Sequence, residues 1–483
     1  MQKLTGFLPD ADPTTPGVIT SCTNFLPFEN GMKGSPTAVT PSEVPALSAE
    51  CLGASIVTKL DDTRRIFAGT TDKLYELVAG AWTDRSGAAY TGGSDTRWTF
   101  AQMGDATLAA NLSDYIQRST TGAFATVATA PKAKIVFSVG SFAMALNTND
   151  GTYGAQTDRW WCSATYDDTS WTPSLSTLAT TGRLVSTPGQ ITAGGRLGEY
   201  AIAYKDRAIY IGQFVGAPAV WDWLQVPGEA GCVGVEAFCD VGGAHFIIGP
   251  DNIWFFDGSR PSPIGTGEVR QWFYNNSSSA YRYKTRCSFD RQNNTVWVFY
   301  CSSSATEPDS ALVYHLQTKQ WGCVTTPCQA VVNYISAGTT IDDLVDVSAT
   351  IDGLASYSFD SQFWLTGGKS LSVFNDSNQL QSLTGISASS TFTTGDVGDD
   401  DSVSLLTKLR LRFAPNYTPT TATVQTFTKM NEGDGLTAAS SGTLIDGKFD
   451  VIQAGRFHRV ALSFTGDVRV LGVGAEIRPD GLY

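Results

Sequence analysis

The residues of this chain that could do chemistry are acidic pairs next to tryptophans. Asp167 and Asp168 follow a Trp-Trp pair, and Asp222 stands between two further tryptophans. Two carboxyl groups facing a sugar between aromatic rings are what a glycosidase or a sugar-binding pocket requires. The candidates for such a site are Trp160, Trp161, Trp221, Trp223, Asp167, Asp168 and Asp222. Their place in alternating strand-like segments favours core packing instead.

The segment around Trp171 is loosely similar to a hairpin motif of sialidases. The motif is Ser-x-Asp-x-Gly-x-Thr-Trp; in SATYDDTSWTP its glycine is missing, and the segment occurs once. A sialidase also needs an arginine cluster for the carboxylate of its substrate. Nothing in the sequence singles out such a cluster.

Other catalytic or metal-binding arrangements are absent from the sequence. There is no Gly-x-Ser-x-Gly elbow, P-loop or dinucleotide fingerprint, and His245, His315 and His458 stand in strand-like contexts, which predicts core or edge positions. Asp10 with Asp12, and the run Asp399 to Asp401, lack the spacing of a calcium loop and predict turns. We therefore predict no enzyme, with no catalytic, cofactor-binding or metal-binding residue.

The nine cysteines do not form a metal or disulfide pattern. Their number is odd and their spacing irregular, at positions 22, 51, 162, 232, 239, 287, 301, 323 and 328. No pair has the two-residue spacing of a zinc knuckle. We interpret them as buried free thiols of a protein that folds in a reducing cytosol. No secretory signal is recognisable at the N-terminus.

Composition indicates an ordered, acidic, mainly β protein. The 483 residues are 42% apolar and only 16% charged, with 46 acidic and 33 basic residues and a net charge of −13. An adhesive nucleic-acid binder needs clustered Lys and Arg, so the charge argues against one. A channel wall with negative charge would still let a DNA duplex slide past, because it repels phosphate. The alternative interpretation of the net charge is that it keeps the protein soluble.

Six segments that run from a polar turn into an aromatic-centred apolar stretch predict the architecture. The aromatics are Tyr75, Tyr115, Trp160, Tyr210, Trp254 and Trp297, so the gaps between them are 40, 45, 50, 44 and 43 residues. A period of this length built from short strands is typical of four-stranded propeller blades. We expect each aromatic to pack between neighbouring blades.

Composition shifts predict three regions. Residues 1–50 are rich in proline, which disfavours regular ladders and predicts an extended arm. Residues 51–385 hold the repeats and all twelve tryptophans, from Trp82 to Trp364. Residues 386–483 are predicted to be an antiparallel β-sandwich. The strands expected are Lys134–Ala145, Tyr200–Tyr204, His245–Ile248, Ala311–Leu316, Ser370–Phe374, Leu405–Phe413, Ala422–Thr428, Arg456–Phe464 and Arg469–Ile477.

Several phrases resemble the tail nozzle proteins of short-tailed bacteriophages, also called packaged-DNA stabilisation proteins. They are FLPDADPTTPGVITSCTNFLPFENGMKGSPTA, DRWWCSATYDDTSWTPS, GRLGEYAIAYKDRAIYIGQFVGAPAVWDW, AHFIIGPDNIWFFDGSRPSPIG, RQNNTVWVFYCSSS, ALVYHLQTKQWG and GRFHRVALSFTGDVRVLGVGAEIRPDG. The resemblance implies a propeller-based subunit of a homo-oligomeric ring, usually a hexamer, below the portal and adaptor proteins. It also implies seats for tail fibres or spikes, and a lumen that genomic DNA crosses without sequence-specific binding.

Two functions are thus predicted. The first is a structural protein of the virion tail, synthesised in the cytoplasm of the bacterial host, with Arg and Lys scarce on the lumen side. The alternative is a carbohydrate-binding or carbohydrate-cleaving propeller, such as a receptor-binding lectin or glycosidase of the virion.

Overall fold

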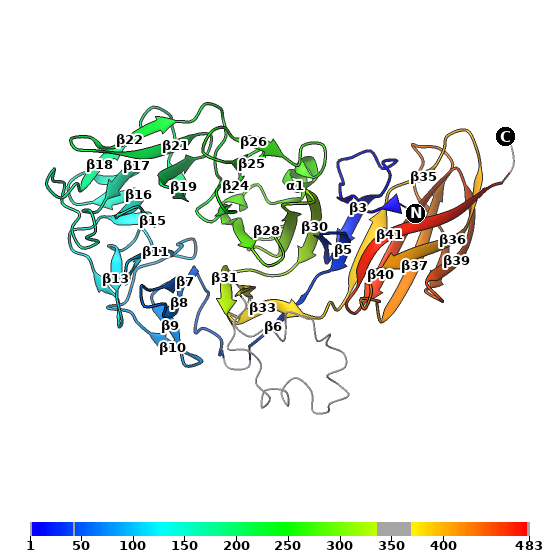
Figure 1. Cartoon of the computed structure of the whole chain (residues 1–483), viewed down its shortest axis with the longest axis horizontal. Coiled ribbons are helices and arrows are strands. Elements are labelled where there is room, and N and C mark those ends of the chain that lie inside the picture. The colour runs from blue at the N-terminus through cyan, green and yellow to red at the C-terminus, as the bar shows by residue number, and fades with distance from the viewer. Residues whose placement is uncertain (1, 42–43, 336–368, 481–483) are drawn as a thin grey trace.

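The computed structural model describes residues 2–41, 44–335 and 369–480. The protein is mainly β and contains a β-propeller, as the repeats predict. Figure 1 shows its sheets following one another from β7 through β15, β21 and β25 to β31, with the C-terminal strands beyond β5 at the opposite end. The described residues hold one short α-helix, α1 (Arg270–Asn276), and one 3-10 turn, η1 (Arg282–Lys284).

Within the described residues, six antiparallel sheets have four strands each, and neighbouring strands pair as short hairpins. In chain order they comprise β7 (Ala54–Thr58), β8 (Arg64–Gly69), β9 (Leu74–Val78) and β10 (Ala81–Asp84); β11 (Thr99–Met103), β12 (Ala106–Ala110), β13 (Gln117–Ser119) and β14 (Ala125–Thr126); β15 (Lys132–Val139), β16 (Phe142–Asp150), β17 (Gly154–Cys162) and β18 (Thr180–Arg183); β19 (Ile191–Leu197), β20 (Tyr200–Lys205), β21 (Ile209–Gly216) and β22 (Val220–Gln225); β23 (Phe238–Asp240), β24 (His245–Ile248), β25 (Ile253–Phe256) and β26 (Ser262–Ile264); and β31 (Ala330–Ile335), β32 (Lys369–Phe374) and β33 (Leu380–Gly385) with β6 (Thr37–Val39).

A further four-stranded unit, β27–β30, begins a ten-stranded sheet. Its order is β27 (Arg286–Asp290), β28 (Thr295–Tyr300), β29 (Ser310–His315), β30 (Gln320–Thr325), β4 (Phe25–Phe28), β5 (Gly31–Gly34), β41 (Arg469–Pro479), β36 (Ser404–Phe413) and β39 (Lys448–Gly455), and β1 (Gln2–Lys3) pairs with β41. The last sheet has the order β2 (Gly6–Phe7), β3 (Val18–Thr23), β34 (Ser390–Thr394), β40 (Phe457–Thr465), β37 (Thr421–Lys429) and β38 (Thr437–Thr443), and β35 (Val397–Gly398) pairs with β40.

Most of the repeated aromatics occupy one position in the blade. Tyr75, Trp160, Tyr210 and Trp254 lie in the third strands β9, β17, β21 and β25. Trp297 lies instead in the second strand of its unit, β28, and Tyr115 lies outside the named strands with 41% of its surface exposed. The period therefore predicts the architecture, but not the same place for every aromatic.

Packing between sheets confirms the expected role for Tyr75, Trp160 and Tyr210, but not for the exposed Tyr115. Trp160 and Tyr210 share one buried cluster, which joins the sheets β15–β18 and β19–β22. Tyr75 is buried together with Val332 and Phe374 of the sheet that contains β31 and β32. Large rings at these positions bury the apolar faces of two sheets at once.

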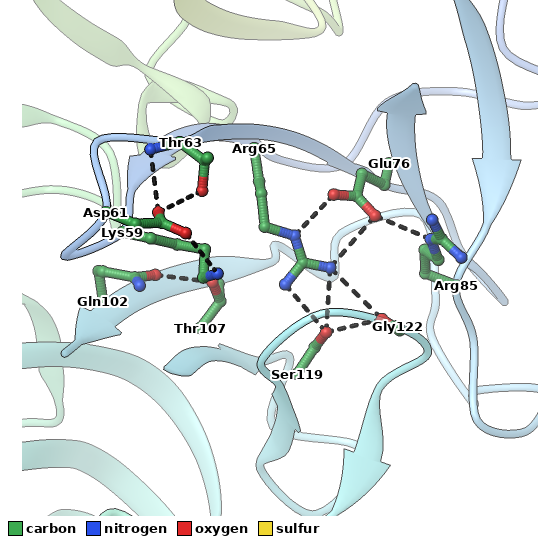
Figure 2. Close-up of polar contacts among 10 residues, drawn as sticks. All are labelled: Lys59, Asp61, Thr63, Arg65, Glu76, Arg85, Gln102, Thr107, Ser119 and Gly122. Atoms are coloured by element: carbon green, nitrogen blue, oxygen red, sulfur yellow. Dashed lines mark hydrogen bonds and ion pairs between the residues drawn. The ribbon is translucent and has the colours of Figure 1, made fainter. Parts of the chain in front are cut away.

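A buried charge network joins the first two sheets (Figure 2). Glu76 on β9 accepts hydrogen bonds from Arg65 Nε on β8 at 2.6 Å and from Arg85 Nε at 2.8 Å. Arg65 also donates to Ser119 Oγ on β13 at 3.1 Å. Burial alone would raise the pKa of Glu76, but the hydrogen bonds and positive charges of the two arginines lower it. The carboxylate thus stays charged between the sheets.

The prediction of an extended arm without ladders is wrong. β3 pairs with β34, β4 with β5 and β30, and β6 with β33, so the first 50 residues enter three sheets. Most of the prolines lie in the connections, where they remove no ladder hydrogen bond, and Pro27 is in β4. A high proline count therefore does not exclude short strands between the prolines. The predicted boundaries at residues 50 and 385 stay a prediction.

The expected C-terminal strands are present as β36, β37, β40 and β41, and β38 and β39 add to them. Leu409 and Leu411 on β36 are buried while Arg410 and Arg412 are exposed, as the alternation predicts. The two C-terminal sheets share a core that includes Phe464 and is continuous with the propeller core. A separate sandwich domain therefore stays a prediction.

Lys134–Ala145 is not one strand, because a turn at Gly140 divides it into β15 and β16. Trp364 lies outside the described residues. Among the described residues, no helix is long and apolar enough to cross a membrane.

Candidate functional site

Charged side chains from successive sheets converge on one pocket of about 300 Å³. Most of them come from segments that precede or begin the first strand of a sheet, whereas Asp206 and Glu307 lie in later connections. First strands of neighbouring sheets contact one another and so form the inner ring of the propeller. The pocket therefore lies on the propeller axis, and we call it the axial pocket. Its charged lining residues are Glu50, Asp95, Arg97, Lys134, Asp206, Glu236, Lys284, Arg286 and Glu307.

Glu236 bridges two arginines in this pocket. Its Oε2 lies 2.7 Å from Arg97 Nη2 and 3.3 Å from Arg286 Nε. The side chain of Arg286 is only 4% exposed. Arg286 Nη1 donates to the carbonyl oxygen of Cys328, and Arg97 Nη1 to that of Cys51. One carboxylate and two backbone carbonyls therefore hold the two guanidinium groups in place.

A second group of charges, in which one lysine lies between two carboxylates, has an excess of negative charge. Lys284 Nζ lies 2.5 Å from Glu307 Oε1 and 3.3 Å from Asp95 Oδ1, and Tyr283 Oη donates to Asp95 at 3.0 Å. Burial alone would lower the pKa of Lys284, but the hydrogen bond and charge of Glu307 raise it. The one negative charge left over in this group offsets the one positive charge left over among Arg97, Arg286 and Glu236.

Glu50 and Lys134 complete the lining. Burial raises the pKa of Glu50, and the charge of Glu307 adds to this effect. Burial lowers the pKa of Lys134, which the charge of Asp206 opposes. Both shifts express the cost of placing a charge away from water.

The described lining of the axial pocket includes neither a metal-binding cluster nor a thiolate. The described residues contain no group of three His, Cys, Asp or Glu side chains that could hold a metal ion. Burial raises the pKa of the nearby thiol of Cys51 to about 12, so it is not a thiolate nucleophile at neutral pH. The arrangement can hold a small polar ligand or simply fix the inner strands.

The residues predicted for a sugar site are mostly in the core. Trp160, Trp161 and Trp221 are each at most 6% exposed, which confirms the core-packing interpretation. The indole of Trp160 packs against that of Trp223, with ring centroids 5.5 Å apart. These rings offer no exposed platform for a sugar.

The three aspartates predicted for the sugar site do not form a facing pair of carboxylates. Asp168 is buried and pairs with Arg118, with 2.5 Å between Oδ2 and Nε. Asp167 is exposed and accepts hydrogen bonds from Thr169 within its own turn, and Asp222 is exposed on β22. The sialidase-like segment ends in the fully buried Trp171, whose Nε1 donates to the carbonyl oxygen of Asp168. This hairpin is thus held by its own contacts.

The three histidines lie apart on β24, β29 and β40, and each is 1% exposed, so the core interpretation is confirmed. His245 Nδ1 lies 2.6 Å from Tyr204 Oη, and His458 Nε2 lies 2.9 Å from Ser404 Oγ. Burial lowers the pKa of all three. Ser404 and His458 form a Ser–His pair, but the group on His458 Nδ1 is the amide of Gln453 at 2.7 Å, not the carboxylate of a catalytic triad.

The acidic turns behave as predicted, with one addition. Asp12 and Asp399 each accept a backbone hydrogen bond from the residue two positions later. Asp10 instead accepts hydrogen bonds from the backbone N–H groups of Gln271 and Trp272, at the start of α1. All nine cysteines are free, and the Sγ atoms of Cys22 and Cys323 lie 3.0 Å apart.

Sequence reasoning missed the axial charges. Asp95, Arg97, Glu236 and Arg286 were not singled out, because none belongs to a motif. Their position in the repeat could have indicated them, because each lies shortly before or at the first strand of a repeat. That position faces the axis once the sheets close into a ring.

No family model and no curated protein matches the chain. Among solved structures, it is similar to YCF48 bound to D1 peptide, at 14% identity and a TM-score of 0.38, over 63% of this chain and 92% of that one. It is also similar to BamB from Moraxella catarrhalis, at 12% identity and a TM-score of 0.38, over 75% and 96%. A third is the WD40 beta propeller domain of Doa1, at 8% identity and a TM-score of 0.40, over 72% and 96%. These likenesses concern the fold alone.

Proposed function

We propose that the chain is a structural subunit of a short-tailed bacteriophage tail, forming a ring around the DNA exit channel below the portal and adaptor. The family resemblance implies a sixfold ring with seats for fibres or spikes. The subunit performs no catalysis in this proposal. It would be synthesised in the host cytoplasm and reside in the virion.

The observation that carries the proposal is the ten-stranded sheet. It runs from the propeller unit β27–β30 through the N-terminal hairpin β4–β5 into β41, β36 and β39. Distant parts of the chain are thus tied by backbone hydrogen bonds rather than by flexible linkers. A subunit that must keep its shape while several partners dock benefits from such continuity.

In this proposal the DNA does not pass through the propeller axis. The axial pocket measures about 300 Å³, the size of a small-molecule site, and charged side chains fill its walls. The DNA channel is therefore the bore of the ring. We expect Arg and Lys to be scarce on the surface that faces this bore, since phosphates then find few adhesive contacts.

Native mass spectrometry and negative-stain microscopy of the purified full-length chain test the proposal. We expect closed rings, with a mass that is a whole multiple of the subunit. A strictly monomeric chain at every protein concentration and in the presence of the adaptor would contradict it. A continuous basic surface lining the bore of a ring would contradict the proposed passage of DNA.

A further inference from the structure

A second hollow lies where three distant parts of the chain meet. It has a volume of about 940 Å³ and lies between the β4–β5 hairpin, the turn between β27 and β28, and the C-terminal strands β36 and β41. We call it the side cleft. Its charged lining consists of Lys3, Lys33, Arg412 and Arg469, with Glu29 as the one carboxylate. A local excess of positive charge is unexpected in a chain of net charge −13.

The cations of the side cleft form no close ion pair with described residues, although the charges of Asp290 and Asp467 act on Lys33 from a longer distance. In the described part of the chain, none of the four lies within 4.0 Å of a carboxylate oxygen. Lys33 and Arg469 also face each other directly in the pairing of β5 with β41. Like charges directly opposite each other on neighbouring strands are destabilising. An anion between them would remove this penalty.

The surroundings orient both side chains. The guanidinium carbon of Arg469 lies 3.5 Å from the ring centroid of Tyr417, and its Nε is buried without a hydrogen-bond partner among the described residues. Lys33 Nζ donates to Asn293 Oδ1 at 2.8 Å. Asn293 is itself fixed, because its Nδ2 donates to Asp290 Oδ2 at 2.7 Å. The two cations are therefore held in place before any ligand arrives.

A buried histidine supplies a further donor. His315 lines the side cleft and is 1% exposed. Its Nδ1 accepts a hydrogen bond from the backbone N–H of Thr318 at 3.2 Å, so the ring proton of the neutral imidazole resides on Nε2. No partner of Nε2 is found in the described ranges. This N–H group is free to donate to an acceptor in the side cleft.

We infer that the side cleft binds a tetrahedral oxyanion of the phosphate class. Lys33, Arg469 and His315 would hold its oxygens, and Arg412 and Lys3 at the rim would add charge. Arginine and lysine are the usual partners of phosphate oxygens. The phosphate can belong to the free ion or to the backbone of a nucleic-acid strand, because the cleft is open to solvent. This inference goes beyond the proposed tail function and does not depend on it.

Binding of two probes to the full-length chain tests the inference: inorganic phosphate by calorimetry, and a fluorescent single-stranded oligonucleotide by anisotropy. We expect at least one probe to bind. Arg412→Gln and the double variant Lys33→Gln/Arg412→Gln should weaken binding, the double variant by about tenfold or more, since hydrogen bonds to charged groups are lost. Arg64→Gln removes a charge from the exposed first residue of β8 and serves as the matched control, with affinity within about twofold of wild type.

The two probes distinguish the free phosphate ion from a nucleic-acid backbone. Binding of phosphate alone assigns the cleft to the free ion. Binding of the oligonucleotide, with a steep loss at high salt that the double variant reduces, assigns it to a phosphodiester backbone. Absence of binding by the wild type, or equal losses in the cleft and control variants, would overturn the inference. Arg412→Gln keeps the test decisive if the double variant does not fold, because Arg412 is exposed. Neither result bears on ring formation, which is measured by mass.

Discussion

The axial pocket and the side cleft are both rich in charge, but they balance it differently. In the axial pocket, Glu236 pairs with Arg97 and Arg286, and Lys284 pairs with Asp95 and Glu307. In the side cleft, Lys33 and Arg469 face each other without a carboxylate within ion-pair distance in the described chain. The axial pocket lies within the propeller. The side cleft lies where the propeller unit β27–β30 meets the β4–β5 hairpin and the C-terminal strands β36 and β41. Charges inside the propeller thus stabilise its closure, whereas those of the cleft are available to a ligand.

The largest expected effect comes from breaking the axial balance. Glu236→Gln leaves Arg97 and Arg286 without their shared carboxylate, so we expect the free energy of unfolding to fall by about 3 kcal/mol. Urea denaturation measures the loss. The matched control is Glu229→Gln, whose exposed carboxylate lies 3.8 Å from Arg207 and should contribute less than about 1 kcal/mol. Equal losses in the two variants would show that the axial charges are not special.

We expect the anion to bind in the side cleft and not in the axial pocket. At about one hundred times its dissociation constant, an anion that binds only the folded state raises the free energy of unfolding by about 2.7 kcal/mol. We expect phosphate or the oligonucleotide to stabilise the wild type in thermal melts, and to stabilise Glu236→Gln to a similar extent. Stabilisation that survives in Lys33→Gln/Arg412→Gln would place the ligand elsewhere.

The unpaired lysine should also reveal itself in the pH dependence of stability. Burial, together with the charge of Arg469, lowers the pKa of Lys33 from 10.5 to about 8, although the charges of Asp290 and Asp467 oppose this shift. Between these pH values the unfolded chain binds more protons than the folded one, so this residue makes stability rise with pH. Lys33→Met should remove that rise and raise the free energy of unfolding at pH 7 by about 1 kcal/mol. Identical pH profiles of wild type and variant, measured by urea denaturation, would contradict the lowered pKa of Lys33.

The smallest effect is expected at an exposed ion pair. Lys73 and Asp84 lie 3.1 Å apart and are both 43% exposed. Lys73→Gln should change the free energy of unfolding by less than about 1 kcal/mol, because solvent screens the pair. A loss as large as that of Glu236→Gln would mean that ion pairing matters here irrespective of burial.

The contrast also indicates what sequence can and cannot predict. The spacing of aromatics such as Trp160 and Tyr210 predicts a propeller, because the period of a repeat is a local property. The axial pair of Arg97 and Glu236 joins residues 139 positions apart, and only ring closure brings them together. The side cleft depends on β5 pairing with β41 across almost the whole chain. The proline content of residues 1–50 predicts an extended arm, yet this segment supplies β4 and β5. Composition does not say where along the segment the prolines lie.

Diffraction from crystals of the full-length chain soaked in selenate, a tetrahedral oxyanion with an anomalous signal, tests the contrast most directly. We predict a selenium peak in the side cleft, within hydrogen-bonding distance of Lys33 and Arg469, and none in the axial pocket. A peak in the axial pocket with an empty side cleft would contradict the account.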